Sequence, residues 1–169
     1  MRSFFTLLFA SLVAAAQIDV VIDDVTALDQ DVQDLTADVR AYNGGLLAQS
    51  PLLLGVTKVH VATRKGYYDS KDLPRPLSET DATRLIDHVN NTLAIDNPIA
   101  VETLKGKKDL FDASGTSIFI KGGLQILLDD HLDFSNEVLE RAPKSLEQDA
   151  NSVVDVISDA LRSGIEFFS

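Results

Sequence analysis

The chain has 169 residues, and its 26 acidic side chains outnumber the 15 basic ones, which gives a net charge of −11. A surface with this negative charge repels nucleic-acid phosphates and anionic lipid headgroups. Neither is therefore an expected partner. The chain contains no cysteine, which excludes disulfides, thiolate metal sites and thiol catalysis. A buried apolar core must therefore stabilise the fold.

Residues 1–16 have the layout of a secretory signal peptide. Arg2 precedes an apolar stretch, and three alanines at residues 14–16 provide the small side chains that signal peptidase requires. The alternative is a membrane anchor, but the stretch is shorter than the roughly 20 residues of a spanning helix. We expect residues 1–16 to be removed and residues 17–169 to form one domain without a transmembrane segment. The protein is then secreted, and either extracellular or associated with the cell wall.

The first part of this domain is expected to contain two helices. Apolar side chains recur every three or four positions over residues 18–42 and predict a long amphipathic helix, which the Asn-Gly-Gly sequence at residues 43–45 ends. Residues 46–68 are ambiguous, because residues 56–63 also alternate as a strand would. We favour a helix, with Pro51 tolerated near its start.

The middle of the chain contains one clear helix start and one proline that interrupts the pattern. A capping-box-like sequence at residues 78–81 begins a helix that continues to about Asp96. Asn97 and Pro98 either kink this helix or end it. Apolar spacing then continues to residue 113.

Two further helices are predicted over about residues 117–142 and 146–165, on either side of Pro143. Each predicted helix has a single apolar stripe and is not stable alone, so the stripes must pack together. The sequence therefore predicts an all-α fold, an antiparallel bundle of about five to six amphipathic helices that follows a cleaved signal peptide.

Catalytic and cofactor motifs are absent from the sequence, including the Gly-x-Ser-x-Gly elbow, His-Glu-x-x-His and the glycine-rich nucleotide turns. The three histidines, His60, His88 and His131, fall on three different predicted helices. They could form a metal site if those helices met, but partly exposed polar residues are the commoner role. We expect a protein that is not an enzyme, with no catalytic residues, no cofactor and no metal.

Large apolar residues are the candidates for contact with a ligand or a surface. They are Leu124, Leu128, Phe111, Phe119, Phe134, Phe167 and Phe168. Most large residues of this kind form the core, but the C-terminal phenylalanine pair either exposes an adhesive end or folds back onto the first helix. Gly122 and Gly123 either mark a helix boundary or a close helix crossing, or leave room for an apolar ligand.

Asn90, Asn91 and Thr92 form an acceptor sequence for N-glycosylation. On a secreted chain Asn90 is a candidate for modification. The alternative is an unmodified polar residue on the outer face of a helix.

Several stretches together resemble one family. They are residues 42–45, 76–82, 107–115, 142–146 and 160–165. In order and spacing they are similar to the fungal hydrophobic surface binding protein A family, which includes cell-wall galactomannoproteins. The resemblance covers nearly all of the predicted domain, although this chain is more acidic than the common pattern and carries Pro98 inside a helical segment.

The resemblance implies a secreted helical bundle without enzymatic activity, and it implies a helix over residues 46–68. It also implies a protein that adsorbs to hydrophobic surfaces, or holds a fatty acid or similar lipid between its helices, or does both. Two alternatives stay open: a glycosylated structural wall protein without a small ligand, and an adaptor that recruits a secreted esterase or cutinase to a hydrophobic polymer.

Overall fold

The computed structural model describes the backbone of residues 2–169 and the side chains of residues 16–169. The predicted signal peptide falls, apart from Ala16, outside the described side chains and stays a prediction. The described chain contains helices and no strand, which confirms the all-α fold. Its elements are α1 (Arg2–Ala41), η1 (Leu47–Gln49), α2 (Ser50–Ser70), α3 (Glu79–Asn90), α4 (Leu93–Lys105), α5 (Lys108–Ala113), α6 (Ser117–Leu139), η2 (Lys144–Leu146) and α7 (Glu147–Phe167).

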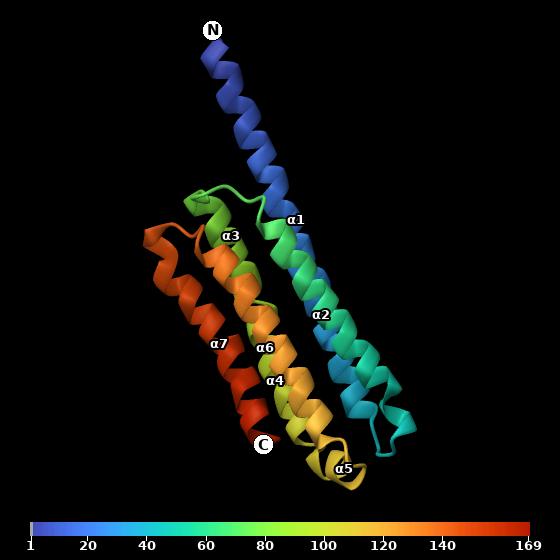
Figure 1. Ribbon diagram of the computed structural model, residues 1–169. Coiled ribbons are helices and arrows are strands. Elements are labelled where there is room, and N and C mark those ends of the chain that lie inside the picture. Colours follow the sequence, from blue (N-terminus) through green and yellow to red (C-terminus); the bar gives the residue numbers. More distant parts are fainter. Residues whose placement is uncertain (1) are drawn as a thin grey trace.

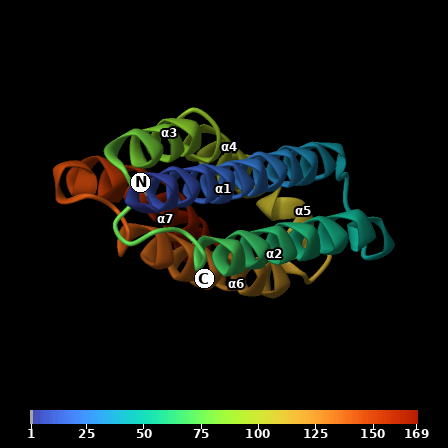
Figure 2. The same cartoon turned by 90° about the horizontal axis from the view of Figure 1, so that it is seen from above.

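The long helices form five rods around one core, because α3 and α4 follow each other along a single rod (Figure 1). Going around the core, α1 packs on α2, α2 on α6, α6 on α7, α7 on α4, and α4 on α1. Figure 2 shows the same rods from above. Helix α1 has α2 on one side and the rod formed by α3 and α4 on the other. Rods that follow each other in the chain run in opposite directions, as predicted (Figure 1). The neighbouring pairs α2 and α6, α1 and α4, and α4 and α7, which are not consecutive rods, run the same way.

The predicted end of the first helix and the helical interpretation of the second segment are confirmed, whereas α1 begins before residue 18 and α2 begins at Ser50, after residue 46. Helix α1 ends at Ala41, and Gly44 and Gly45 adopt φ values of 99° and 93°, a region that side chains with a Cβ atom rarely occupy. Helix α2 begins at Ser50 with Pro51 in its first turn, where a missing backbone N–H costs no hydrogen bond. The ambiguous segment is therefore helical from Ser50 onward.

The prediction of one helix from residue 78 to Asp96, kinked or ended at Pro98, is wrong in its boundary. Helix α3 ends at Asn90, α4 begins at Leu93, and Pro98 lies inside α4. The side chains of Asn91 and Thr92 donate hydrogen bonds of 2.6 and 2.7 Å to carbonyls four residues earlier. Such bonds compete with the helical backbone and favour a break, which leaves Pro98 close to the start of a new helix.

The core is continuous along the bundle but is packed differently at its two ends. Near the C-terminus, Phe111 is fully buried, stacks on Tyr42 at a ring-centroid distance of 5.0 Å, and meets the edge of Phe168 at 6.1 Å. A Cβ atom at Gly164 would lie 2.9 Å from a methyl carbon of Leu124, so α7 approaches α6 closely here. Large rings and close helix contacts fill this end of the core.

Candidate ligand-binding site

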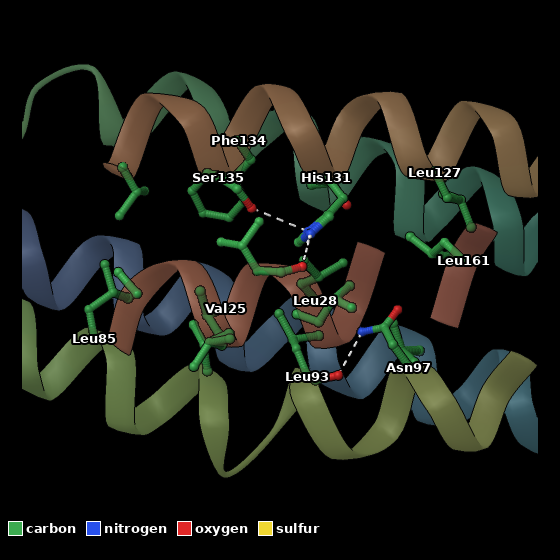
Figure 3. A pocket seen from close by; sticks show the side chains of 18 of the residues that line it. Val25, Leu28, Leu85, Leu93, Asn97, Leu127, His131, Phe134, Ser135 and Leu161 are labelled. Atoms are coloured by element: carbon green, nitrogen blue, oxygen red, sulfur yellow. Dashed lines mark hydrogen bonds between the residues drawn. The ribbon is translucent and has the colours of Figure 1, made fainter. Parts of the chain in front are cut away.

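A cavity of about 110 Å³ lies along the axis of the bundle, in the half that contains α3 (Figure 3). We call this half the cavity half. All five rods contribute side chains to the lining. Its apolar residues include Val25, Leu28, Val32, Val59, Leu85, Ile86, Val89, Leu93, Leu127, Phe134, Val138, Leu139, Ala150, Val153, Val154, Ile157 and Leu161.

The cavity exists because medium-sized side chains line the centre of a five-rod ring. Valine, leucine, isoleucine and alanine provide almost all of its apolar wall, and among the described residues Phe134 is its single aromatic member. Five rods enclose a wider centre than four, and side chains of this size do not meet across it. Interiors are otherwise packed at crystal-like density, so a hollow lined by apolar groups is a candidate binding site.

The few polar groups in the wall already have partners within the protein. The Nε2 atom of His131 lies 3.3 Å from the carbonyl oxygen of Val154, and its Nδ1 atom lies 3.3 Å from the hydroxyl of Ser135 (Figure 3). Asn97 donates to the carbonyl of Leu93 at 2.9 Å. Burial lowers the pKa of His131, so its ring is neutral near pH 7 and the wall presents no fixed charge from this residue.

Two buried carboxylates of α1 lie on the same half of the bundle. The first of them, Asp29, accepts a hydrogen bond of 2.8 Å from Gln33, which also donates to Asp96 of α4 at 2.7 Å. Gln33 therefore holds the carboxylates of Asp29 and Asp96 close together. Burial, and after it the charge of Asp96, raises the pKa of Asp29 to about 6. Burial likewise raises the pKa of Asp24, although Lys65 donates a hydrogen bond to it.

The predicted contact residues are distributed over the whole molecule. Phe134 lines the cavity, whereas Phe111 and Phe168 are buried at the other end, and Phe119 and Phe167 are exposed. Leu124 is buried in the core, and Leu128 packs against it partly buried; neither lines the cavity. Their contact with a ligand or a surface stays a prediction.

The C-terminal phenylalanines combine the two arrangements that the sequence left open. Phe168 packs into the core against Phe111, while the ring of Phe167 is 45% exposed. Gly122 and Gly123 lie inside α6, which begins at Ser117, so the helix-boundary interpretation is wrong. Gly123 faces Val56 of α2, and neither glycine lines the cavity.

The three histidines have different partners. His60 forms a 2.5 Å contact with Asp130, His88 pairs with Thr26 at 2.9 Å, and His131 lies in the cavity wall. Within residues 16–169, no group of three or more potential ligands is arranged to hold a metal ion. Asn90 is an exposed residue at the end of α3, and its glycosylation stays a prediction.

Most of the cavity wall was not singled out by the sequence. Leu28, Leu85 and Val153 have the helical spacing of inward positions. Residues at the opposite end of the core, which is filled around Phe111 and which we call the solid end, have the same spacing. No sequence signal separates inward residues that meet a partner from inward residues that border a hollow. His131 could have been noticed as a polar residue within an apolar stripe.

Residues 18–140 match the model of the hydrophobic surface binding protein A family. The chain belongs to this family. The match extends from α1 through α6, and it confirms the resemblance seen in the sequence. No curated protein sequence matches the chain. Across the described part of the chain, no helix has both the length and the apolar character needed to cross a membrane.

Solved structures with the same fold include two ligand-binding domains of one protein and one further protein, all three in complex with fatty acids. One is ligand-binding domain 1 of the Penicillium marneffei MP1 protein, complexed with arachidonic acids, with a TM-score of 0.85 and 25% sequence identity. The aligned region covers 90% of this chain and 99% of that domain. Domain 2 of the same protein, complexed with multiple arachidonic acids, has a TM-score of 0.82 at 23% identity, with coverages of 92% and 96%. AFMP4P in complex with palmitic acid has a TM-score of 0.85 at 20% identity, with coverages of 90% and 99%.

Proposed function

We propose that this family member holds the hydrocarbon chain of a fatty acid, or of a similar lipid, in the cavity between its five rods, without catalysing a reaction. The observation that carries the proposal is an axial, almost entirely apolar cavity in a fold shared with a 25% identical domain that is complexed with arachidonic acids. The polar groups of the wall, including the Ser135 hydroxyl that lies 3.3 Å from His131, are paired within the protein, which leaves an apolar lining suited to a hydrocarbon chain.

The hydrophobic effect supplies enough free energy for this function. Burial of an acyl chain contributes about 0.8 kcal/mol per methylene, so a long chain contributes roughly 10 kcal/mol. Loss of translational and rotational freedom costs about 4 to 15 kcal/mol. The difference corresponds to weak or moderate affinity, so binding is expected to be reversible.

The cavity must widen to accept a long chain. Its volume of about 110 Å³ is below the roughly 150 Å³ of an engineered cavity that binds benzene. Helix α3 is the rod segment best placed to move, because it makes fewer contacts with α1 and α7 than α4 does. Exposed polar contacts, Arg84 with Asp19 and His88 with Thr26, hold it against α1, and such contacts stabilise weakly.

The proposal is tested by filling the cavity from one face of α7. Val153 is buried in the wall, whereas Val156, about one turn further along the same helix, is 45% exposed and does not line the cavity. We expect Val153→Phe to reduce uptake of a fluorescent fatty acid by about tenfold or more, because the added ring occupies the space of the ligand. Val156→Phe makes the same chemical change outside the cavity and should leave uptake unchanged.

Two results would count against the proposal. Equal uptake by the two variants would place the ligand elsewhere, and no uptake by the unmodified protein would remove the function altogether. Circular dichroism and thermal unfolding of both variants establish that a loss of uptake reflects the cavity and not a loss of the fold.

A second candidate function is adsorption to hydrophobic surfaces, which membership of the family favours. It is tested by depletion of the protein from solution onto uncharged alkyl-coated beads, at low and at high salt. Secretion, glycosylation at Asn90, a purely structural role in the wall and recruitment of an esterase or cutinase stay predictions.

A further inference from the structure

Six large apolar side chains are exposed at the end of the bundle opposite the cavity half. They belong to the α1–α2 turn and to the first turns of α2 and α6, which lie at the same end in Figure 1. Their exposed fractions lie between 59% and 89%. They are Leu46, Leu47, Leu53, Leu54, Ile118 and Phe119, and we call them the apolar end.

Buried polar contacts join the two segments that carry these side chains. The Nε2 atom of Gln49 lies within hydrogen-bonding distance of three hydroxyl oxygens, at 2.6 Å from Thr116, 2.9 Å from Tyr42 and 3.1 Å from Ser114. Gln49 and Thr116 are almost fully buried. The turn before α2 and the turn before α6 are therefore held to each other, and the exposed side chains are presented from a fixed base.

Formal charges are absent from both segments. Residues 41–57 and residues 113–120 contain no Asp, Glu, Lys, Arg or His, although the chain as a whole carries a net charge of −11. The segment 41–57 is the longest uncharged run after the predicted signal peptide. A charged group that is pressed against an apolar phase loses its hydration at high cost, so these two segments can meet such a phase without that cost.

We propose that the apolar end is the face by which the protein contacts an uncharged aliphatic surface, with its acidic sides left in water. The absence of charge, the exposed leucines and Phe119, and the family to which the chain belongs point to the same occupant. The six side chains themselves offer no charge that a basic or acidic protein partner could pair with. The inference rests on the second candidate function, adsorption, and is independent of the fatty-acid cavity.

The cavity and the apolar end are separate sites. None of the six side chains lines the cavity, whose wall is formed by residues of the opposite half and the middle of the bundle. Adsorption through this end therefore leaves the proposed ligand site unobstructed, and each activity can be removed by substitution without the other.

The test measures adsorption isotherms on uncharged octadecyl-coated beads for two matched double variants. One carries Leu47→Gln and Phe119→Gln at the apolar end. The control carries Ile95→Gln and Val156→Gln, which replace two exposed apolar side chains of α4 and α7. We expect the first pair to lower the bead–water partition coefficient by about tenfold or more, and the control pair to change it by less than about twofold.

Fatty-acid uptake, thermal unfolding and sedimentation are measured on the same proteins. Retained uptake and fold in the Leu47 and Phe119 variant, with lost adsorption, support the proposal. If that variant does not fold, the pair Leu46→Gln and Ile118→Gln replaces it.

Equal adsorption by the two double variants would overturn the assignment of this face while leaving adsorption intact. Failure of the unmodified protein to adsorb would overturn adsorption and the face together. A dimer that the Leu47 and Phe119 substitutions dissociate, with adsorption unchanged, would assign the end to a second copy of the chain and also overturn the proposal.

Discussion

The two halves of this bundle are built from the same kind of amphipathic helix, yet they differ in how the core is filled and where charge lies. Around Phe111, aromatic rings and close helix contacts fill the core, and the two segments that carry the nearby apolar end contain no charged residue. In the cavity half, smaller side chains leave a hollow. Ion pairs join different helices there, such as Arg64 with Asp133 and Arg84 with Asp19.

The difference shows that amphipathic spacing alone does not determine two features of a bundle. One is whether the inward side chains meet across the axis, and the other is whether the outward side chains are charged. A solid core beneath a group of exposed, uncharged side chains gives a rigid base for an external contact. A hollow core beneath a charged exterior gives an interior that can open and remain hydrated outside.

The largest expected effect tests the solid end. Phe111 is fully buried, and we expect Phe111→Ala to lower the free energy of unfolding by about 3 to 5 kcal/mol. Urea denaturation provides the measurement. Phe119→Ala is the control, because its side chain is 65% exposed and its removal should change stability by about 0.5 kcal/mol or less. Similar losses for both would contradict the division into a solid core and an exposed end.

A pair of glycine substitutions tests how closely the helices approach. A Cβ atom at Gly164 would lie 2.9 Å from Leu124 and 3.0 Å from Val101, whereas one at Gly122 would meet nothing within 4 Å. We expect Gly164→Ala to destabilise the protein by about 1 to 3 kcal/mol. Gly122→Ala should stabilise it by up to about 1 kcal/mol through helix propensity. Stabilisation by both, measured by thermal unfolding, would show that α7 has room to move.

The buried acid of the cavity half predicts a pH dependence with a definite sign. Because the pKa of Asp29 is raised to about 6, the folded state holds its proton where the unfolded state has lost it. This contribution to stability is complete below about pH 4 and is lost as the pH rises through 6. Asp29→Asn removes the buried charge, so we expect a gain of about 1 to 2 kcal/mol at pH 8 and little change at pH 4. Urea denaturation at both values measures it, and an equal effect at both would refute the burial argument.

His131 is expected to give a smaller effect of opposite sign. Burial lowers its pKa, so below about pH 6.5 the unfolded state binds a proton that the folded state does not. Stability therefore falls as the pH decreases from this value. We expect His131→Phe to make the unfolding curve less sensitive to pH between 5 and 7. An unchanged slope in the His131 variant would mean that the ring is hydrated.

Local signals predicted much of the fold. The Asn-Gly-Gly sequence placed the end of α1, Ser78 placed the start of α3, and the helical interpretation of residues 46–68 proved right from Ser50 onward. The break at Asn91 and Thr92 was missed, because side-chain bonds to the backbone have no periodicity and Pro98 gave a stronger signal. Of the candidate contact residues, Phe134 was placed at the cavity by the tertiary structure.

By itself, the sequence determined the helices, their apolar stripes, the acidic surface and the absence of cysteine, since these follow from local spacing and composition. The tertiary structure decided that five rods surround an unfilled axis, and that uncharged segments around Leu47 and Phe119 share one end. Both features depend on which side chains face each other across the bundle. That relation joins residues far apart in the chain, and no local pattern encodes it.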